Sequence, residues 1–249
     1  MTALETKTLC KAFGALTVAD RIDFRLEAGA RHALIGPNGA GKTTFVNMLT
    51  GALAPSSGAI LLGGEDVTAL SQAKRVRRGI GRTFQINSLF RSLSVLDNVA
   101  LAVAEREGVA ARMWRAASRY PEIIAECEAL LKTLGLQDDV AKRISDLPYG
   151  KQRLVEIAIA LGMRPRVLLL DEPAAGVPSH ESHRILDVLA ALPAEISILI
   201  IEHDMDLVFR FARRITVLAA GAVLMHGTPQ EVANDRRVRE VYLGEAKHG

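Results

Sequence analysis

GPNGAGKT, residues 36–43, follows an apolar run at 33–35 and decides the fold. It matches the phosphate-binding loop G-x-x-x-x-G-K-[ST], which joins a strand to a helix. Glycines let backbone N–H groups approach phosphate oxygens, and the helix N-terminus adds positive partial charge. Lys42 is expected to reach the terminal phosphates, and the Thr43 hydroxyl to bind magnesium. The predicted nucleotide-binding residues here are Gly36, Pro37, Asn38, Gly39, Ala40, Gly41, Lys42, Thr43 and Thr44.

VLLLDE, residues 167–172, reads as a buried strand that ends in two carboxylates. In proteins with a phosphate-binding loop, an aspartate at this strand end holds magnesium, and Asp171 is predicted to do so. Glu172 is expected to point to the other side of the strand end and to orient or deprotonate an attacking water. Because acidic residues are common after buried strands, the pair acquires this meaning only together with the loop at 36–43.

Composition sets the broad class. The chain has 249 residues, 49% hydrophobic and 24% charged, which predicts a globular protein of one domain and argues against disorder or a coiled coil. A net charge of +3 and 4% aromatic residues give little support for a nucleic-acid partner. Two isolated cysteines fit a reducing compartment. No signal peptide and no membrane-spanning run are expected.

The remaining pattern predicts an α/β fold. Alternation at 22–26 indicates a half-buried strand, and helical spacing covers about 94–107 and 121–134. From 167 to 219 strands and helices alternate, which favours a parallel sheet covered by helices. The segment 108–120 carries arginines around Trp114, and a solvated helix face is favoured there over a contact with lipid head groups.

Three further features carry a family resemblance: Gln85 in RTFQ, the segment 147–153 and His203 in IEHD. Together with the loop and the strand end, their order resembles the ATP-binding subunits of ABC transporters over essentially the whole chain. The resemblance implies catalytic roles for Glu172, His203, Gln85 and Lys42. Gln85 would join Thr43 and Asp171 as a magnesium ligand.

Phe13 stands where an aromatic residue usually stacks on adenine in this family, although a lone aromatic near an N-terminal strand also fits a core position. His203 alone after a buried strand would suggest a structural histidine. Only the joint order of the motifs favours its contact with the γ-phosphate.

The family signature, usually LSGGQ, appears here as LPYGK at 147–151. In such ATPases this segment caps the nucleotide held by the opposite subunit, which implies that Leu147, Tyr149 and Gly150 contact that nucleotide. Pro148 has neither hydroxyl nor N–H, so the contact is expected to be altered rather than absent. Pro178 likewise replaces the carboxylate of the usual SALD motif.

These departures, with EHDM at 202–205 and VYLG at 241–244, resemble the larger ATP-binding subunit of branched-chain or hydrophobic amino-acid importers. A lipopolysaccharide-export ATPase is the alternative, since its tail is similar. A small-molecule kinase with the phosphate-binding loop is less favoured, because it needs catalytic lid arginines and has no signature segment.

The expected architecture is therefore a parallel α/β core with an N-terminal antiparallel β subdomain and a helical subdomain. We expect the core at 1–85 and 163–225, the helical subdomain at 86–162 and a helical tail at 226–249. The resemblance implies ATP and Mg2+ as cofactors. It also implies a second ATP-binding subunit, two transmembrane permease subunits, an extracytoplasmic substrate-binding protein and a peripheral place on the cytoplasmic face of the membrane.

Overall fold

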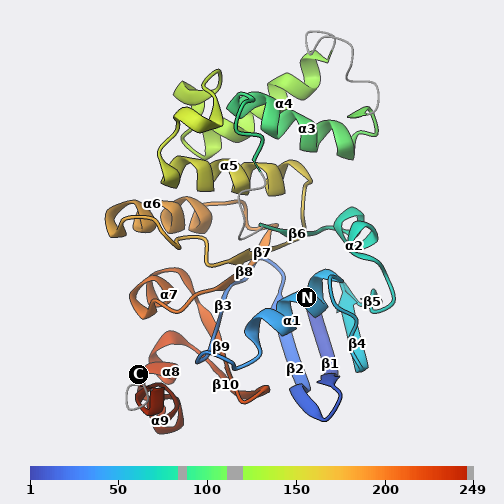
Figure 1. The fold of residues 1–249 in the computed structure, drawn as a ribbon, viewed down its shortest axis with the longest axis vertical. Helices are drawn as coiled ribbons and strands as arrows, with labels where there is room; N and C mark the ends of the chain where they lie inside the picture. Colours follow the sequence, from blue (N-terminus) through green and yellow to red (C-terminus); the bar gives the residue numbers. More distant parts are fainter. Residues whose placement is uncertain (84–88, 111–119, 246–249) are drawn as a thin grey trace.

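The computed structural model describes residues 1–83, 89–110 and 120–245, which form two sheets surrounded by helices (Figure 1). The larger sheet has the strand order β10-β9-β3-β8-β7-β6. Strands β9 to β6 run parallel, whereas β10 pairs antiparallel with β9. The strands are β3 (Arg31–Ile35), β6 (Ile80–Arg82), β7 (Val167–Asp171), β8 (Ser197–Ile201), β9 (Arg214–Ala219) and β10 (Ala222–Gly227).

The central strands β3, β7 and β8 are buried along their whole length, which explains their nearly continuous apolar sequences. Successive side chains point to opposite faces of the sheet and join two separate cores. Leu168 and Leu170 pack in the core beneath the helical part of the molecule. Leu169 packs in the other core, together with Phe45. The sheet therefore separates two hydrophobic layers and holds the ends of its strands rigidly between them.

A smaller antiparallel sheet covers the second core. In β2 the side chains of Ile22, Phe24 and Leu26 are buried, while the residues between them are exposed, as the alternation predicts. The Phe24 ring meets Phe45 edge-on at 5.5 Å between centroids. Its strands, in the order β2-β1-β4-β5, are β1 (Thr2–Phe13), β2 (Leu16–Glu27), β4 (Ser57–Leu62) and β5 (Glu65–Asp66).

Helices α3, α4 and α5 form a layer at one end of the molecule, beyond the sheets (Figure 1). The start of α3 is fixed by a capping box between Ser94 and Asp97. The helices are α1 (Lys42–Thr50), α2 (Gln72–Arg78), α3 (Val95–Arg106), α4 (Pro121–Thr133), α5 (Tyr149–Gly162), α6 (Ser179–Ala190), α7 (Met205–Phe211), α8 (Pro229–Asn234) and α9 (Arg236–Glu245). In the part of the chain that is described, no helix is both long and apolar enough to cross a bilayer.

The fold class expected from the sequence is confirmed, and the helices at 94–107 and 121–134 lie where the pattern predicts them. The sequence pattern missed β6 and β10. β6 has only three residues between a charged helix and a polar loop, so it shows no periodicity. The arginines around Trp114 lie outside the described residues. The division into a core, a helical subdomain at 86–162 and a tail stays a prediction.

Candidate nucleotide-hydrolysing site

The loop at 36–43 leaves the carboxyl end of β3 and turns into α1, as its motif requires. Two of its glycines are irreplaceable for steric reasons. A Cβ atom on Gly36 would lie 2.2 Å from the Leu218 carbonyl oxygen, and one on Gly41 would lie 2.7 Å from that of Val18. Gly41 also has a φ of 96°, a left-handed value that favours glycine. The packing of neighbouring backbone thus fixes the loop at the start of the helix.

Lys42 is the first residue of α1, and its ammonium group lies back across the loop. Its Nζ donates to the carbonyl oxygens of Gly36, at 2.5 Å, and Pro37, at 2.9 Å. Thr43, next along the helix, is exposed. The N–H groups of a first helical turn have no partners within the helix, so they can act as donors here. Together with the Lys42 ammonium and the Thr43 hydroxyl, they bring three kinds of donor to this loop. Such an arrangement suits a polyphosphate.

Asp171, at the end of β7, is 4% exposed and faces α1. Its Oδ2 accepts a hydrogen bond from Arg82 Nη2 at 3.0 Å, and Arg82 Nη1 donates to Asn47 Oδ1 at 2.7 Å. The sequence argument gave neither partner a role. No periodic signal marks them, because they meet Asp171 only through the pairing of β6 with β7 and the packing of α1 on the sheet.

Glu172 faces a different partner from its neighbour, as expected. Its backbone has a left-handed φ of 46°, a strained value for a residue with a side chain. Its N–H donates to the Ile201 carbonyl at the end of β8, at 2.9 Å. Its Oε1 lies 3.4 Å from Nδ1 of His203, whose side chain is 67% exposed. The strained turn therefore brings the predicted base to the predicted histidine.

Glu202 is a buried acid beside this pair and is 2% exposed. Its Oε1 accepts the N–H of Ala174 at 3.4 Å, and its Oε2 accepts that of His203 at 3.3 Å. Burial raises the pKa of the Glu202 carboxyl, against the opposing effect of these N–H donors. The sequence argument used Glu202 only as part of a motif. Its position after a buried strand, the signal that identified Asp171, also applied to it.

The loop, Asp171, Glu172 and His203 meet at one edge of the sheet, which we call the strand-end site. They lie at the carboxyl ends of β3, β8 and β7, which are consecutive in the sheet, so these ends lie together. Ligands of open α/β sheets bind at this edge. Gln85, predicted to complete the site, lies outside the described residues.

Phe13 is 51% exposed, and Lys11 Nζ lies 5.0 Å from the centre of its ring. The interpretation of Phe13 as a core residue is therefore wrong. Its contact with adenine stays a prediction.

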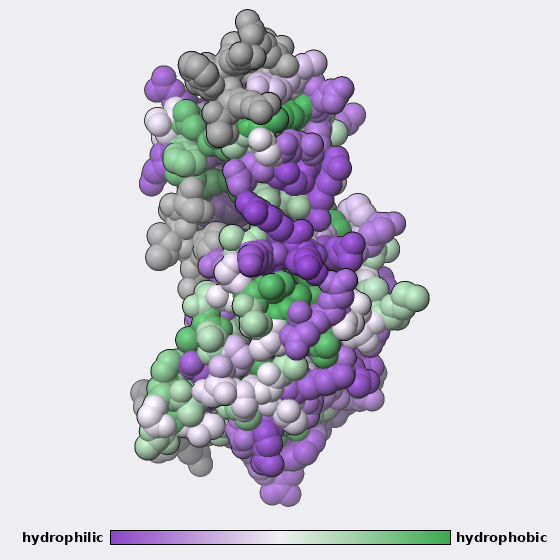
Figure 2. Space-filling view, turned by 90° about the vertical axis from the view of Figure 1, so that its right-hand side faces the viewer, coloured by the Kyte–Doolittle hydropathy of each residue, from purple (hydrophilic) through white to green (hydrophobic). Residues whose placement is uncertain are grey.

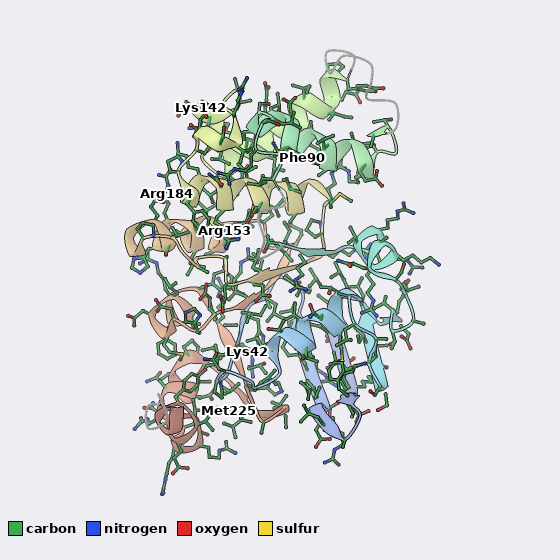
Figure 3. The ribbon with its side chains drawn as sticks, viewed as in Figure 1. Lys42, Phe90, Lys142, Arg153, Arg184 and Met225 are labelled. Atoms are coloured by element: carbon green, nitrogen blue, oxygen red, sulfur yellow. The ribbon has the colours of Figure 1, made fainter. Side chains whose placement is uncertain are left out.

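The signature segment, residues 147–153, begins α5 and lies outside the strand-end site of its own chain. Figure 3 shows Arg153 on α5 and Lys42 on α1 at separate levels of the molecule. The Tyr149 ring packs on the Arg153 guanidinium, 5.2 Å from its centre, and next to Gly176. A Cβ on Gly150 would lie 2.2 Å from Glu181 Oε2. An acid of α6 thus approaches the start of α5, a contact that the sequence argument did not predict.

Lys151 occupies the last position of the signature and is tied to a buried acid. Asp139 accepts hydrogen bonds from Lys151 Nζ at 2.5 Å and Lys142 Nζ at 2.7 Å. Burial acts to raise the pKa of Asp139, but the two lysines outweigh it and hold that pKa below its usual range. The lysine that departs from the family pattern therefore anchors α5 to the preceding turn.

A phosphate-binding loop, a buried strand-end aspartate and a glutamate–histidine pair on neighbouring parallel strands define a nucleotide-hydrolysing cassette. The family model described as ABC transporter matches residues 19–175, and that described as branched-chain amino acid ATP-binding cassette transporter matches residues 222–248. The chain belongs to the ATP-binding subunits of ABC transporters, which are ATPases coupled to transport.

Two curated relatives align along the whole chain. The high-affinity branched-chain amino acid transport ATP-binding protein LivG of Escherichia coli K12 is 37% identical, with 98% of each chain covered. The lipopolysaccharide export system ATP-binding protein LptB of the same organism is 34% identical, also with 98% of each chain covered. Among solved structures, an ATP-binding cassette of an ABC transporter in its ADP conformation superposes with a TM-score of 0.85 at 28% identity, covering 98% of this chain and 99% of the other.

Proposed function

We propose that this chain hydrolyses ATP to energise the import of branched-chain or other hydrophobic amino acids. The observation that carries the proposal is the strand-end site, in which the phosphate-binding loop, the carboxylates of Asp171 and Glu172 and the His203 ring lie at the carboxyl ends of neighbouring strands. The 37% identity with LivG, against 34% with LptB, and the match of residues 222–248 to the branched-chain transporter model together favour an amino-acid importer over lipopolysaccharide export. The signature segment and the match to the ABC transporter family together argue against the alternative of a small-molecule kinase.

In this proposal the chain binds Mg2+-ATP at the strand-end site. The Thr43 hydroxyl and the Asp171 carboxylate are hard oxygen donors of the kind that magnesium prefers, so the residues fit the ion. Gln85 is the third proposed ligand. Bound magnesium would neutralise charge on the β- and γ-phosphates. Lys42, released from the carbonyls of Gly36 and Pro37, would contact the same phosphates.

Glu172 then acts as the general base. It is partly exposed, so water can reach its carboxylate, and it lies next to His203. If His203 carries its proton on Nδ1, this N–H lies on the Glu172 side of the ring and leaves Nε2 for the γ-phosphate side. Glu202 holds the backbone of both loops through Ala174 and His203. The base and the histidine are thereby kept at a fixed separation while water attacks.

A second ATP-binding subunit completes each site in this proposal. Leu147, Tyr149 and Gly150 would cap the nucleotide held by the partner, because they lie at the start of α5, and Arg153 of that helix lies away from Lys42 of the same chain (Figure 3). The N–H groups in the first turn of α5, of a kind that a helix leaves without intrahelical partners, would supply the contact that the missing serine hydroxyl cannot. Whether the partner is a second copy or a different chain is left open.

The permease would dock in a groove between α2 and the helical layer. Two cavities of about 400 Å³ and 120 Å³ share Val76 and Met163, and the smaller has a mostly apolar lining. Figure 2 looks at the side that carries α2 and shows hydrophilic side chains concentrated across its middle. Five arginines line the larger cavity: Arg77, Arg78, Arg106, Arg164 and Arg166.

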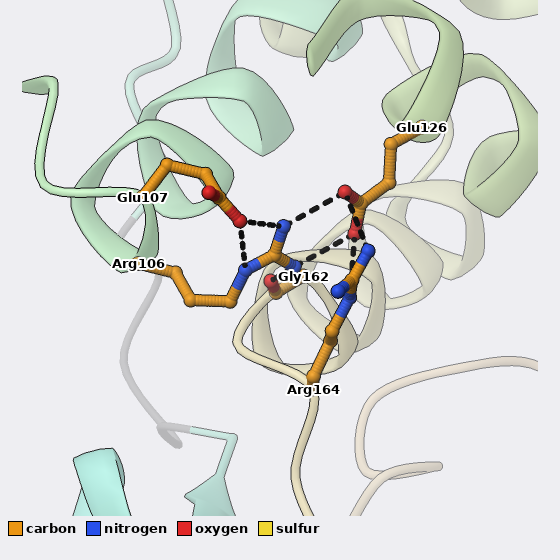
Figure 4. Close-up of polar contacts among 5 residues, drawn as sticks. All are labelled: Arg106, Glu107, Glu126, Gly162 and Arg164. Atoms are coloured by element: carbon orange, nitrogen blue, oxygen red, sulfur yellow. Dashed lines mark hydrogen bonds and ion pairs between the residues drawn. The ribbon is translucent and has the colours of Figure 1, made fainter. Parts of the chain in front are cut away.

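Two of these arginines share one acidic partner inside the chain. Arg106 and Arg164 both bind the carboxylate of Glu126, with separations from 2.7 to 3.2 Å (Figure 4). The hydrogen bonds that Arg106 donates to Glu126 raise the pKa of Arg106. Arg77 and Arg166 have no such partner among the described residues and leave a positive rim. A permease helix with an apolar face and an acidic end would complement it, which would place the chain on the cytoplasmic face of the membrane.

The test is to purify the chain with its membrane complex in detergent and identify the chains and ligand that accompany it. We expect two permease chains, and ATPase activity that rises when a binding protein loaded with leucine, isoleucine or valine is added. Stimulation by a lipopolysaccharide precursor instead would favour the exporter. Transfer of labelled phosphate from ATP to a metabolite rather than to water would favour the kinase.

A further inference from the structure

Arg82 is a buried cation whose two terminal nitrogens bind two different parts of the strand-end site. Its side chain is 13% exposed, and it joins Asn47 on α1 to Asp171 at the end of β7. In the β6–β7 pair, Arg82 lies opposite Leu169. Leu169 and Asp171 are two residues apart, so their side chains share the sheet face that α1 covers. The strand register therefore directs the guanidinium between these two groups.

The hydrogen bond from Arg82 occupies only one of the two carboxylate oxygens of Asp171. Among the described residues, the hydrogen bond from Arg82 to Oδ2 is the one polar contact of the Asp171 carboxylate. Arg82 Nε is buried and has no partner there either, so the two terminal nitrogens alone orient the planar guanidinium. A lysine carries the same charge but has no fork with which to bind Asn47 and Asp171 at once.

We propose that Arg82 is a positioning residue for magnesium: it holds Asp171 through Oδ2, keeps Oδ1 directed toward the ion, and ties this geometry to α1 through Asn47. The inference rests on the proposed magnesium site at Thr43 and Asp171. Arg82 itself does not contact the metal or the reacting atoms. α1 begins with the phosphate-binding residues, so one guanidinium sets the distance between the phosphate loop and the metal-binding carboxylate.

The experiment measures binding of a fluorescent ATP analogue to the purified full chain, in a Glu172→Gln background that prevents turnover. Binding is titrated against Mg2+ and is also measured in EDTA. Arg82→Gln is expected to raise the Mg2+ concentration for half-maximal binding by about tenfold or more, since partners that orient a metal ligand contribute roughly 10–100-fold to metal affinity. Affinity in EDTA should stay unchanged. Arg82→Lys and Asn47→Ala should give smaller shifts in the same direction.

The matched control is Arg236→Gln, which removes an exposed arginine on α9 that pairs with Glu240 far from the site. It should leave both measurements unchanged. Equal loss of affinity in Mg2+ and EDTA, or an unchanged Mg2+ requirement with a lower unfolding temperature, would assign Arg82 a purely structural role and overturn the inference. If Arg82→Gln does not fold, the Mg2+ requirement and the affinity in EDTA of Arg82→Lys and Asn47→Ala test the inference instead.

Asp171→Asn in the same titration separates this inference from the proposed function. If wild-type binding shows no Mg2+ dependence, or Asp171→Asn leaves that dependence intact, the proposed magnesium site itself is wrong. If Asp171→Asn shifts the Mg2+ requirement and the Arg82 variants do not, only the role of Arg82 is wrong.

Discussion

The strand-end site and the signature segment belong to one chain but are supported in opposite ways. Asp171 ends a strand that is buried throughout and Glu172 follows it, and their contacts run to Arg82 and His203 of the same chain. Tyr149 begins a helix without a side-chain cap and is partly exposed. Acidic side chains held by partners within their own chain fit the chemical step, whereas an exposed helix start fits a surface that acts on a partner. Each prediction below changes one region, and the variants of the signature segment are also measured for an effect on ATP binding at the strand-end site.

Glu172→Gln is expected to have the largest effect. Loss of a general base typically lowers turnover by about 10²–10⁴-fold. ATP binding should persist, because the phosphate loop and Asp171 are unchanged, and the two-subunit complex should stay closed around ATP. Steady-state ATPase assays and size-exclusion chromatography with ATP check both parts. Glu195→Gln, which alters an exposed acid, is the control. Near-normal hydrolysis by Glu172→Gln would remove this residue as the base.

Lys42→Ala tests the other half of the strand-end site. Hydrogen bonds to charged groups contribute about 1.5–3 kcal/mol, so ATP affinity of the isolated subunit should fall by roughly 10–100-fold. Equilibrium binding of a fluorescent ATP analogue measures this. Lys132→Ala, on the exposed face of α4, should bind normally. An unchanged affinity for Lys42→Ala would contradict its role in the phosphate loop.

Motifs of consecutive residues could be predicted from the sequence, whereas contacts between distant residues could not. The loop at 36–43 and the strand end at 167–172 were predictable because glycine sterics, burial and strand-end chemistry act on consecutive residues. Arg82 and Glu181 were not identified as partners. Arg82 reaches Asp171 because a short strand at the sheet edge pairs with β7, and Glu181 approaches Gly150 because α6 packs near α5. Such neighbours depend on tertiary arrangement, which no local pattern encodes.

Asp139→Asn perturbs the support of the signature segment alone. It removes the buried charge that holds Lys142 and Lys151, and the expected loss is about 2 kcal/mol of unfolding free energy. This is below the usual cost of breaking a buried pair, because both lysines are partly exposed. Urea unfolding at neutral pH measures it, with Asp138→Asn as the exposed neighbouring control. ATP affinity of the isolated subunit should not change.

The same variant predicts a pH dependence. The pKa of Asp139 is lowered in the folded chain, so its contribution to stability is present above the pKa of the unfolded state and is lost as the pH falls through the folded value. The stability difference between wild type and Asp139→Asn should therefore shrink in acid. A difference that stays constant between neutral and acidic pH would show that the lysine contacts do not stabilise the charged form.

Pro148→Ser is expected to have the smallest effect and discriminates most sharply between the two regions. A serine at this N-cap restores both a hydroxyl and an N–H at the position that we propose faces the partner's nucleotide. One added hydrogen bond of about 1 kcal/mol should raise the ATPase rate of the assembled transporter roughly fivefold. ATP binding to the isolated subunit should be unaffected, because its own strand-end site is untouched.

Pro148→Ala is the matched control for this change, since alanine restores the N–H without the hydroxyl. If only Pro148→Ser accelerates the complex, the hydroxyl is the group that the signature segment lacks. If both variants do, the missing N–H is responsible. Equal changes in the complex and in the isolated subunit would mean that the segment acts on the nucleotide of its own chain, and the division of labour between the two regions would fail.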